Sequence, residues 1–125
     1  MKVIIDTQVY LWYINGEEKL TSASKSVFES YNTDRLISVV SIWEIAIKNS
    51  IDKLPLKVPF QNLFHRQGYN YIQISDAALN LLHKLPYYKH RDPFDRMLAA
   101  QCLSENISII SSDSAFDLYS VNRIW

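Results

Sequence analysis

Residues 36–47 read LISVVSIWEIAI, a short β-branched run followed directly by a helical pattern. The run at 36–40 barely alternates between apolar and polar residues, which is typical of strands covered on both faces. Similar runs at 3–5 and 107–110 predict two more strands, and 71–74 is a fourth candidate. A fifth, weaker candidate at 121–125 is expected at an edge of the sheet.

Helical patterns lie between these runs. We expect helices over 22–31, 41–52, 60–67 and 75–85, and a long one that opens at Asp92-Pro93. Ser41 is expected to cap the second of these, and proline is well tolerated at the first position of the last. Strands that alternate with helices predict a three-layer α/β/α sandwich with a central, mostly parallel sheet. We expect one domain over 1–125.

The composition limits the possible classes of function. Of 125 residues, 48% are apolar, and 13 basic residues balance 13 acidic ones. With no net charge, a polyanionic partner would have to be held by a local patch or by metal ions. The single cysteine, Cys102, excludes an internal disulfide and predicts a buried structural thiol. No signal peptide or membrane-length apolar run is recognisable, so we expect a cytoplasmic protein without membrane contact.

Acidic residues follow the predicted strands. Asp6 ends the first strand and Asp113 follows the run at 107–110. Glu44 is expected in the first turn of the helix after the second strand, and Asp92 and Asp95 in the first turn of the last long helix. Because sites in parallel sheets form at the carboxyl ends of the strands, we expect these acids at one edge.

Glu44 also has purely structural interpretations. It follows Ser41 by three residues, as in a capping box, and it can pair with Lys48 one turn on. Against these, Glu44 is the only charge in the stretch 42–47, and a helix apolar nearly all round is a buried one. A buried carboxylate needs a partner or a cation.

Each of the other acids can be interpreted either as a helix cap or as a functional residue. Asp92 is best explained as an N-cap, and Asp113 could cap a helix that starts at Ser114. Asp95 could complement the helix dipole, but it heads the apolar stripe that contains Leu98 and Ala99. This position on the core-facing side favours a functional role for Asp95.

Clustered carboxylates repel one another unless a cation neutralises them. Since no histidine or cysteine accompanies them at ligand spacing, Mg²⁺ or Mn²⁺ fits better than zinc. Such a site suits phosphodiester hydrolysis. The only glycines, Gly16 and Gly68, follow no strand, which excludes dinucleotide-binding and P-loop motifs. No nucleophile elbow is present, and Asp6 lacks the adjacent acid of a receiver domain.

At these residues the sequence resembles the PIN-domain family, specifically VapC-like toxins of type II toxin–antitoxin systems. The matching pieces are Ile5-Asp6-Thr7 with Leu11-Trp12, Ser38 with 41–48 (SIWEIAIK), Lys53-Leu54, 90–96 (HRDPFDR) with 98–101 (LAAQ), and Ser112-Asp113. One departure is Gln8, which stands where many relatives have histidine.

The resemblance implies that Asp6, Glu44, Asp95 and Asp113 are the catalytic, metal-binding acids. It also implies an endoribonuclease that uses one or two Mg²⁺ or Mn²⁺ ions, is neutralised by a small antitoxin and forms a homodimer. Four polar residues near these acids are expected to support them: Thr7, Ser41, Asp92 and Ser112.

The segment 84–91 interleaves basic and aromatic residues, a pattern that suits single-stranded RNA as well as a solvated loop. Lys89, Arg91 and Arg96 are candidates for substrate binding, although Arg96 is more readily explained as holding a carboxylate. His90 is expected to support the loop. The aromatic residues Tyr10, Trp12 and Tyr13 belong either to the core or to a groove for a partner.

Three functions remain open at this point. The leading one is a toxin ribonuclease. A housekeeping RNA-processing nuclease has the same chemistry, so only its genetic context would distinguish it. A binding module without cleavage is the third, and the presence of all four acids argues against it.

Overall fold

The computed structural model describes residues 1–64, 66–87 and 91–125. It contains a five-stranded sheet in the order β3-β2-β1-β4-β5, in which every neighbouring pair is parallel. The strands are β1 (Lys2–Ile5), β2 (Asp34–Ser38), β3 (Tyr69–Ile72), β4 (Ser108–Ile110) and β5 (Arg123–Ile124). All five expected strands are present, the last one at an edge as predicted.

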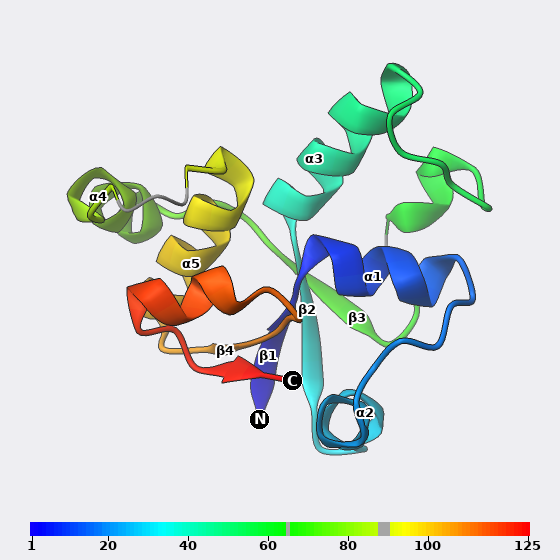
Figure 1. Cartoon of the computed structure of the whole chain (residues 1–125), viewed down its shortest axis with the longest axis horizontal. Helices are drawn as coiled ribbons and strands as arrows, with labels where there is room; N and C mark the ends of the chain where they lie inside the picture. The colour runs from blue at the N-terminus through cyan, green and yellow to red at the C-terminus, as the bar shows by residue number, and fades with distance from the viewer. Residues whose placement is uncertain (65, 88–90) are drawn as a thin grey trace.

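Helices cover both faces of this sheet, which confirms the three-layer α/β/α architecture (Figure 1). The helical elements are α1 (Thr7–Ile14), α2 (Ser22–Glu29), α3 (Val39–Ser50), α4 (Asp76–Lys84) and α5 (Pro93–Glu105), with the 3-10 helices η1 (Phe60–Leu63) and η2 (Ser114–Tyr119). Figure 1 shows α4, α5 and η2 on one side and α1 and α2 on the other. Within the described part of the chain, no helix combines the length and apolar content needed to span a bilayer.

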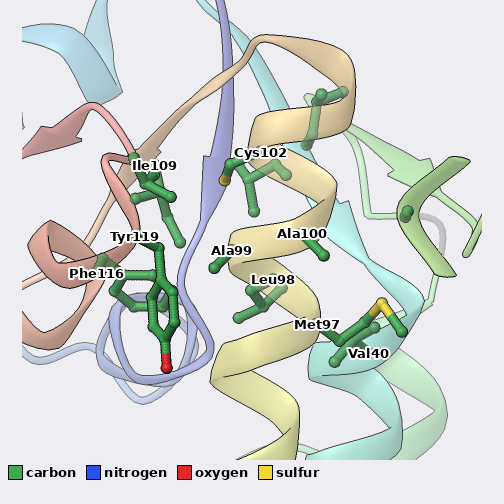
Figure 2. Close-up of a cluster of buried hydrophobic side chains, with 13 residues drawn as sticks. Val40, Met97, Leu98, Ala99, Ala100, Cys102, Ile109, Phe116 and Tyr119 are labelled. Carbon is green, nitrogen blue, oxygen red and sulfur yellow. The ribbon is translucent and has the colours of Figure 1, made fainter. Parts of the chain in front are cut away.

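Alternating strand residues supply two hydrophobic cores. Ile4 and Ile109 face the core beneath α5 and η2, which Figure 2 shows with Phe116 beside Ile109. Cys102 lies in this core, and burial raises the pKa of its thiol to about 12, so it is a structural residue as expected. Ile5 and its counterparts Val3, Ile37 and Ile110 face the second core, which α1 and α3 cover. The sheet is therefore buried on both faces around β1.

The boundary between β2 and α3 differs from the prediction. The strand ends at Ser38 and the helix begins at Val39, so the expected strand end at residue 40 and the expected cap at Ser41 are both wrong. Ser38 is the N-cap, because its hydroxyl accepts a hydrogen bond from the Val40 amide at 3.0 Å. Glu44 consequently lies beyond the first turn of α3, and it does not form a capping box with Ser41.

Two further elements differ from the prediction. The helix expected over 60–67 is only η1, because the backbone is already extended at Phe64. The Leu63 carbonyl accepts hydrogen bonds from the hydroxyls of Tyr10 and Tyr71, which takes the place of a continued helical bond. Helix α1 was not predicted: five of its eight residues are buried, so its sequence lacks the polar face of an amphipathic helix, and Asp6 at its N-cap makes no side-chain capping hydrogen bond.

Candidate active site

Asp6 is a buried carboxylate at the carboxyl end of the central strand. Its side chain is 6% exposed, and its Oδ2 accepts a hydrogen bond from the Ser111 hydroxyl at 2.7 Å. Burial, with a smaller contribution from the neighbouring charges of Asp95 and Glu44, raises the pKa of Asp6 to about 7, although hydrogen bonds from Ser111 and Thr7 act in the opposite direction. Asp6 therefore lies in a desolvated site that it shares with other acids.

Glu44 is the second buried carboxylate, with 7% of its surface exposed. One oxygen, Oε2, accepts a hydrogen bond from Lys48 Nζ at 2.6 Å, as the four-residue spacing predicted. The other, Oε1, is buried without a hydrogen-bond partner among the described residues. A buried acceptor without a partner is costly, so this oxygen is available to a cation.

The amino end of α5 brings Asp95 to the same place. Asp92 caps the helix as predicted, because its Oδ1 accepts hydrogen bonds from the amides of Phe94 and Asp95, both at 2.9 Å. Asp95 is half-buried in the first turn, and its charge contributes to the raised pKa of Asp6. Its charge also raises the pKa of Lys48, although the hydrogen bond to Glu44 is the larger cause. The fold thus gathers Asp6, Glu44 and Asp95 from three elements.

Asp113 reaches this site differently. It is exposed and caps η2, with its Oδ1 accepting a hydrogen bond from the Ala115 amide at 2.9 Å. Its backbone is tied to the site through Ser111, whose hydroxyl donates to Asp6 and accepts from the Asp113 amide at 3.0 Å. Ser112 is exposed, and the described contacts give it no link to the acids. Ser111, which we did not predict, makes the supporting contact instead.

Buried polar pairs connect the elements that carry the acids. The Thr7 hydroxyl donates to Ser41 Oγ at 2.8 Å, which joins α1 to α3. The Ser38 hydroxyl donates to Gln101 Oε1 at 2.6 Å, and Gln101 Nε2 donates to the Gln73 carbonyl at 3.2 Å. Thr7 and Ser41 were expected near the site. Ser38 and Gln101 belong to the segments that carry the family resemblance, but the sequence gives no sign that these two side chains pair.

Comparison with known families identifies the chain. The model of the PIN domain matches residues 3–122. The chain belongs to the PIN-domain family. This confirms the family resemblance of the sequence motifs, whose acids lie within the matched region.

Solved structures share this PIN-domain fold at low sequence identity. VapBC2 from Rickettsia felis, bound to a DNA fragment from its promoter, aligns with a TM-score of 0.69 at 14% identity over 100% of both chains. A toxin–antitoxin complex from Klebsiella pneumoniae aligns with a TM-score of 0.61 at 16% identity, over 90% of this chain and 87% of that one. FitAcB from Neisseria gonorrhoeae aligns with a TM-score of 0.58 at 12% identity, over 98% and 96%. No curated protein sequence matches the chain.

The acids of this PIN domain fit a divalent cation in their chemistry. Carboxylate oxygens are the ligands that Mg²⁺ and Mn²⁺ prefer, and Glu44 Oε1 is such an oxygen, buried and unpaired. Within residues 1–64, 66–87 and 91–125, no three acidic, histidine or cysteine side chains are close enough together to hold an ion as they stand. A cation would therefore have to draw the carboxylates of Asp6, Glu44 and Asp95 together.

The candidate substrate residues have different environments. Arg96 is 5% exposed and donates to the carbonyls of Pro86 and Leu85 at 2.8 and 3.2 Å, and to the Tyr119 hydroxyl at 3.3 Å. In the described contacts Arg96 therefore holds backbone carbonyls and a hydroxyl instead of the expected carboxylate. Arg91 is exposed. Lys89 and His90 lie outside the described residues.

The three aromatic residues of α1 also lie in different environments. Tyr10 is fully buried and donates to the Leu63 carbonyl at 3.0 Å, so it belongs to the core. Trp12 packs against Trp125, with ring centroids 5.9 Å apart. Tyr13 is 45% exposed and lines a groove of about 460 Å³, whose lining includes none of Asp6, Glu44 and Asp95.

Proposed function

We propose that this PIN domain is a metal-dependent endoribonuclease that hydrolyses RNA phosphodiester bonds. The observation that carries the proposal is the pair of buried carboxylates, Asp6 and Glu44, one of which has an unpaired oxygen. A buried oxygen without a hydrogen-bond partner and a carboxylate with a strongly raised pKa both cost free energy, and such groups are concentrated at functional sites. Membership of the PIN-domain family supports the same interpretation.

Asp6, Glu44 and Asp95 would hold one or two Mg²⁺ or Mn²⁺ ions, with Asp113 contributing after rotation away from its cap on η2. A cation held there lowers the pKa of an attacking water and stabilises the charge that develops on the phosphate. Ser111 fixes the orientation of the Asp6 carboxylate, and Lys48 fixes that of Glu44. The protein thereby sets the direction of the ligand oxygens before substrate binds.

The substrate would be positioned by cations beside the acids. Arg91 is exposed and near the start of α5, so its guanidinium is available to a phosphate group. Lys89 is proposed for the same role from its sequence position. Arg96 acts indirectly, because its hydrogen bonds to Leu85 and Pro86 hold the segment after α4 against α5.

Cleavage of a single-stranded RNA with added Mg²⁺ or Mn²⁺ tests the proposal. Asp6→Asn and Asp95→Asn should each reduce kcat/KM by about 100-fold or more, because each removes a ligand charge. Asp76→Asn, which changes an exposed acid in the first turn of α4, is the matched control and should cleave like the parent. Equal activity in all four proteins would exclude the proposed site, and metal-independent cleavage would exclude the mechanism.

We further propose that the nuclease is the toxin of a toxin–antitoxin pair that acts on RNA in the cytoplasm, with a small antitoxin and a second copy of the chain as partners. The support is the shared fold with a toxin–antitoxin complex. Induced expression should arrest growth, and Asp6→Asn should abolish the arrest. An antitoxin encoded beside the gene should relieve it and co-purify with the parent. Growth without arrest, from an active enzyme, would indicate the housekeeping nuclease instead.

A further inference from the structure

A hollow of about 360 Å³ lies between α4 and the start of α5, the helix that carries Asp95. Its position follows from Pro93, the first residue of α5, and Arg96, the residue after Asp95. No acidic side chain contributes to its described lining. The lining residues are Leu79, Leu82, His83, Tyr87, Arg91, Pro93 and Arg96.

Tyr87 and Arg96 form a stacked pair on one wall of this hollow. The Arg96 guanidinium carbon lies 4.3 Å from the centroid of the Tyr87 ring. Tyr87 as a whole is nevertheless 76% exposed, so most of the residue remains open to a ligand. Because Arg96 is itself fixed by the Leu85 and Pro86 carbonyls, the ring rests on a rigid base.

The charge of Arg96 is not compensated within the hollow. Its described hydrogen-bond partners are two carbonyl oxygens and a hydroxyl, all of them neutral. Arg91 adds a second permanent cation, which is exposed. A chain without net charge therefore has a local concentration of positive charge next to an open aromatic ring.

We propose that this hollow is a nucleotide subsite for single-stranded RNA, in which a base stacks on Tyr87 and a backbone phosphate binds Arg91. Stacking on aromatic rings combined with cations along the backbone is how proteins hold single strands without reading sequence. The apolar side chains of Leu79 and Leu82 provide a wall for the base. The inference rests on the proposed ribonuclease function, since the subsite would hold the strand beside the acids that cleave it.

A duplex fits these features poorly, because its bases are stacked on one another and cannot reach a protein ring. The subsite should consequently favour unpaired RNA over a hairpin stem of the same sequence. It should also tolerate any base at the stacked position, since every base has a face that can stack.

The test measures binding and cleavage separately. Binding of a fluorescent single-stranded RNA is measured with EDTA present, and kcat and KM with Mn²⁺. Tyr87→Leu should raise Kd about tenfold, whereas Tyr87→Phe, which keeps the ring, should bind like the parent. Tyr31→Leu changes a fully exposed tyrosine outside the hollow and serves as the matched control. Thermal unfolding of each variant shows whether it is folded.

Arg91→Gln tests the phosphate contact. It should weaken binding and reduce the slope of log Kd against log salt concentration by about 0.7, the value for one phosphate on a single strand. Lys57→Gln, which removes an exposed cation elsewhere, should leave the slope unchanged. In cleavage assays both hollow variants should act on KM more than on kcat.

The outcomes distinguish the subsite from the proposed function. A parent that cleaves RNA while folded Tyr87→Leu binds and cleaves equally well would overturn the subsite and leave the nuclease intact. Tyr87-dependent binding by a parent that never cleaves would support the subsite and overturn the nuclease. If the parent neither binds nor cleaves single-stranded RNA, both are wrong.

Discussion

The two ends of the sheet hold acidic residues in opposite environments. At the carboxyl end, Asp6 and Glu44 are buried within the protein. At the amino end of β2 and β3, the groove of about 460 Å³ is lined by Glu17, Glu18 and Glu29, which are all exposed. Although the groove is large, its carboxylates are exposed to water, which solvates their charge without a bound cation.

This difference favours the carboxyl end as the candidate site, because a buried polar group without a partner costs free energy and a hydrated one does not. The groove also contains Arg35, but the guanidinium there is satisfied locally. It donates to the carbonyls of Phe28 and Gly68 at 2.6 and 3.3 Å and lies over the Phe28 and Tyr69 rings. These contacts hold Arg35 within the fold, whereas Glu44 Oε1 is buried and has no described partner. We therefore interpret the groove as structural packing and the acids as the site.

The largest expected difference between the two ends of the sheet is their contribution to the pH dependence of the free energy of unfolding. The pKa of Asp6 is about 7 in the folded protein against an ordinary value of 3.8, so the folded state binds the proton more tightly than the unfolded state. Without metal, the free energy of unfolding should consequently fall as pH rises from about 4 to about 7. The total loss is on the order of a few kcal/mol. Urea unfolding in EDTA across this range measures it.

Asp6→Asn should remove most of this pH dependence, and the same change at Glu17 in the groove should leave it intact. Mn²⁺ should stabilise the parent more at pH 8 than at pH 5.5, because the ion competes with the proton for Asp6. A parent whose stability is flat between pH 4 and 7 would show that Asp6 is not desolvated in solution.

The sequence was sufficient for the sheet and for the location of the acids. The three β-branched runs scarcely alternate, which favours strands covered on both faces, and the ends of parallel strands meet at one edge. Asp6, Glu44 and Asp95 follow from that rule. The pairing of Glu44 with Lys48 could also be predicted from the sequence, because Lys48 lies one helical turn away.

The supporting contacts depend on where each element begins and on the direction in which each side chain points, and the sequence specifies neither. Ser111 and Ser112 are identical residue types, and only the backbone path after β4 decides that Ser111 points to Asp6. Ser38 and Ser41 pose the same ambiguity at the start of α3, where β-branched Val39 and Val40 favour a strand as much as a helix. Asp113 was correctly anticipated as a cap, and its membership of the site remains a prediction from the family resemblance.

A smaller effect tests whether the groove is only structural. Arg35→Met keeps the aliphatic stem but leaves the Phe28 and Gly68 carbonyls without their donor. We expect a loss of about 1 kcal/mol in the free energy of unfolding, which for a chain of this size lowers Tm by about 3–6 °C. Lys57→Met, at an exposed position, controls for the lost charge and should not change Tm.

Because Asp6, Glu44 and Asp95 lie at the opposite end of the strands, cleavage by Arg35→Met well below its Tm should equal that of the parent. A selective loss of cleavage in folded Arg35→Met would mean that the groove takes part in the function, and that burial of charge alone does not separate the two ends.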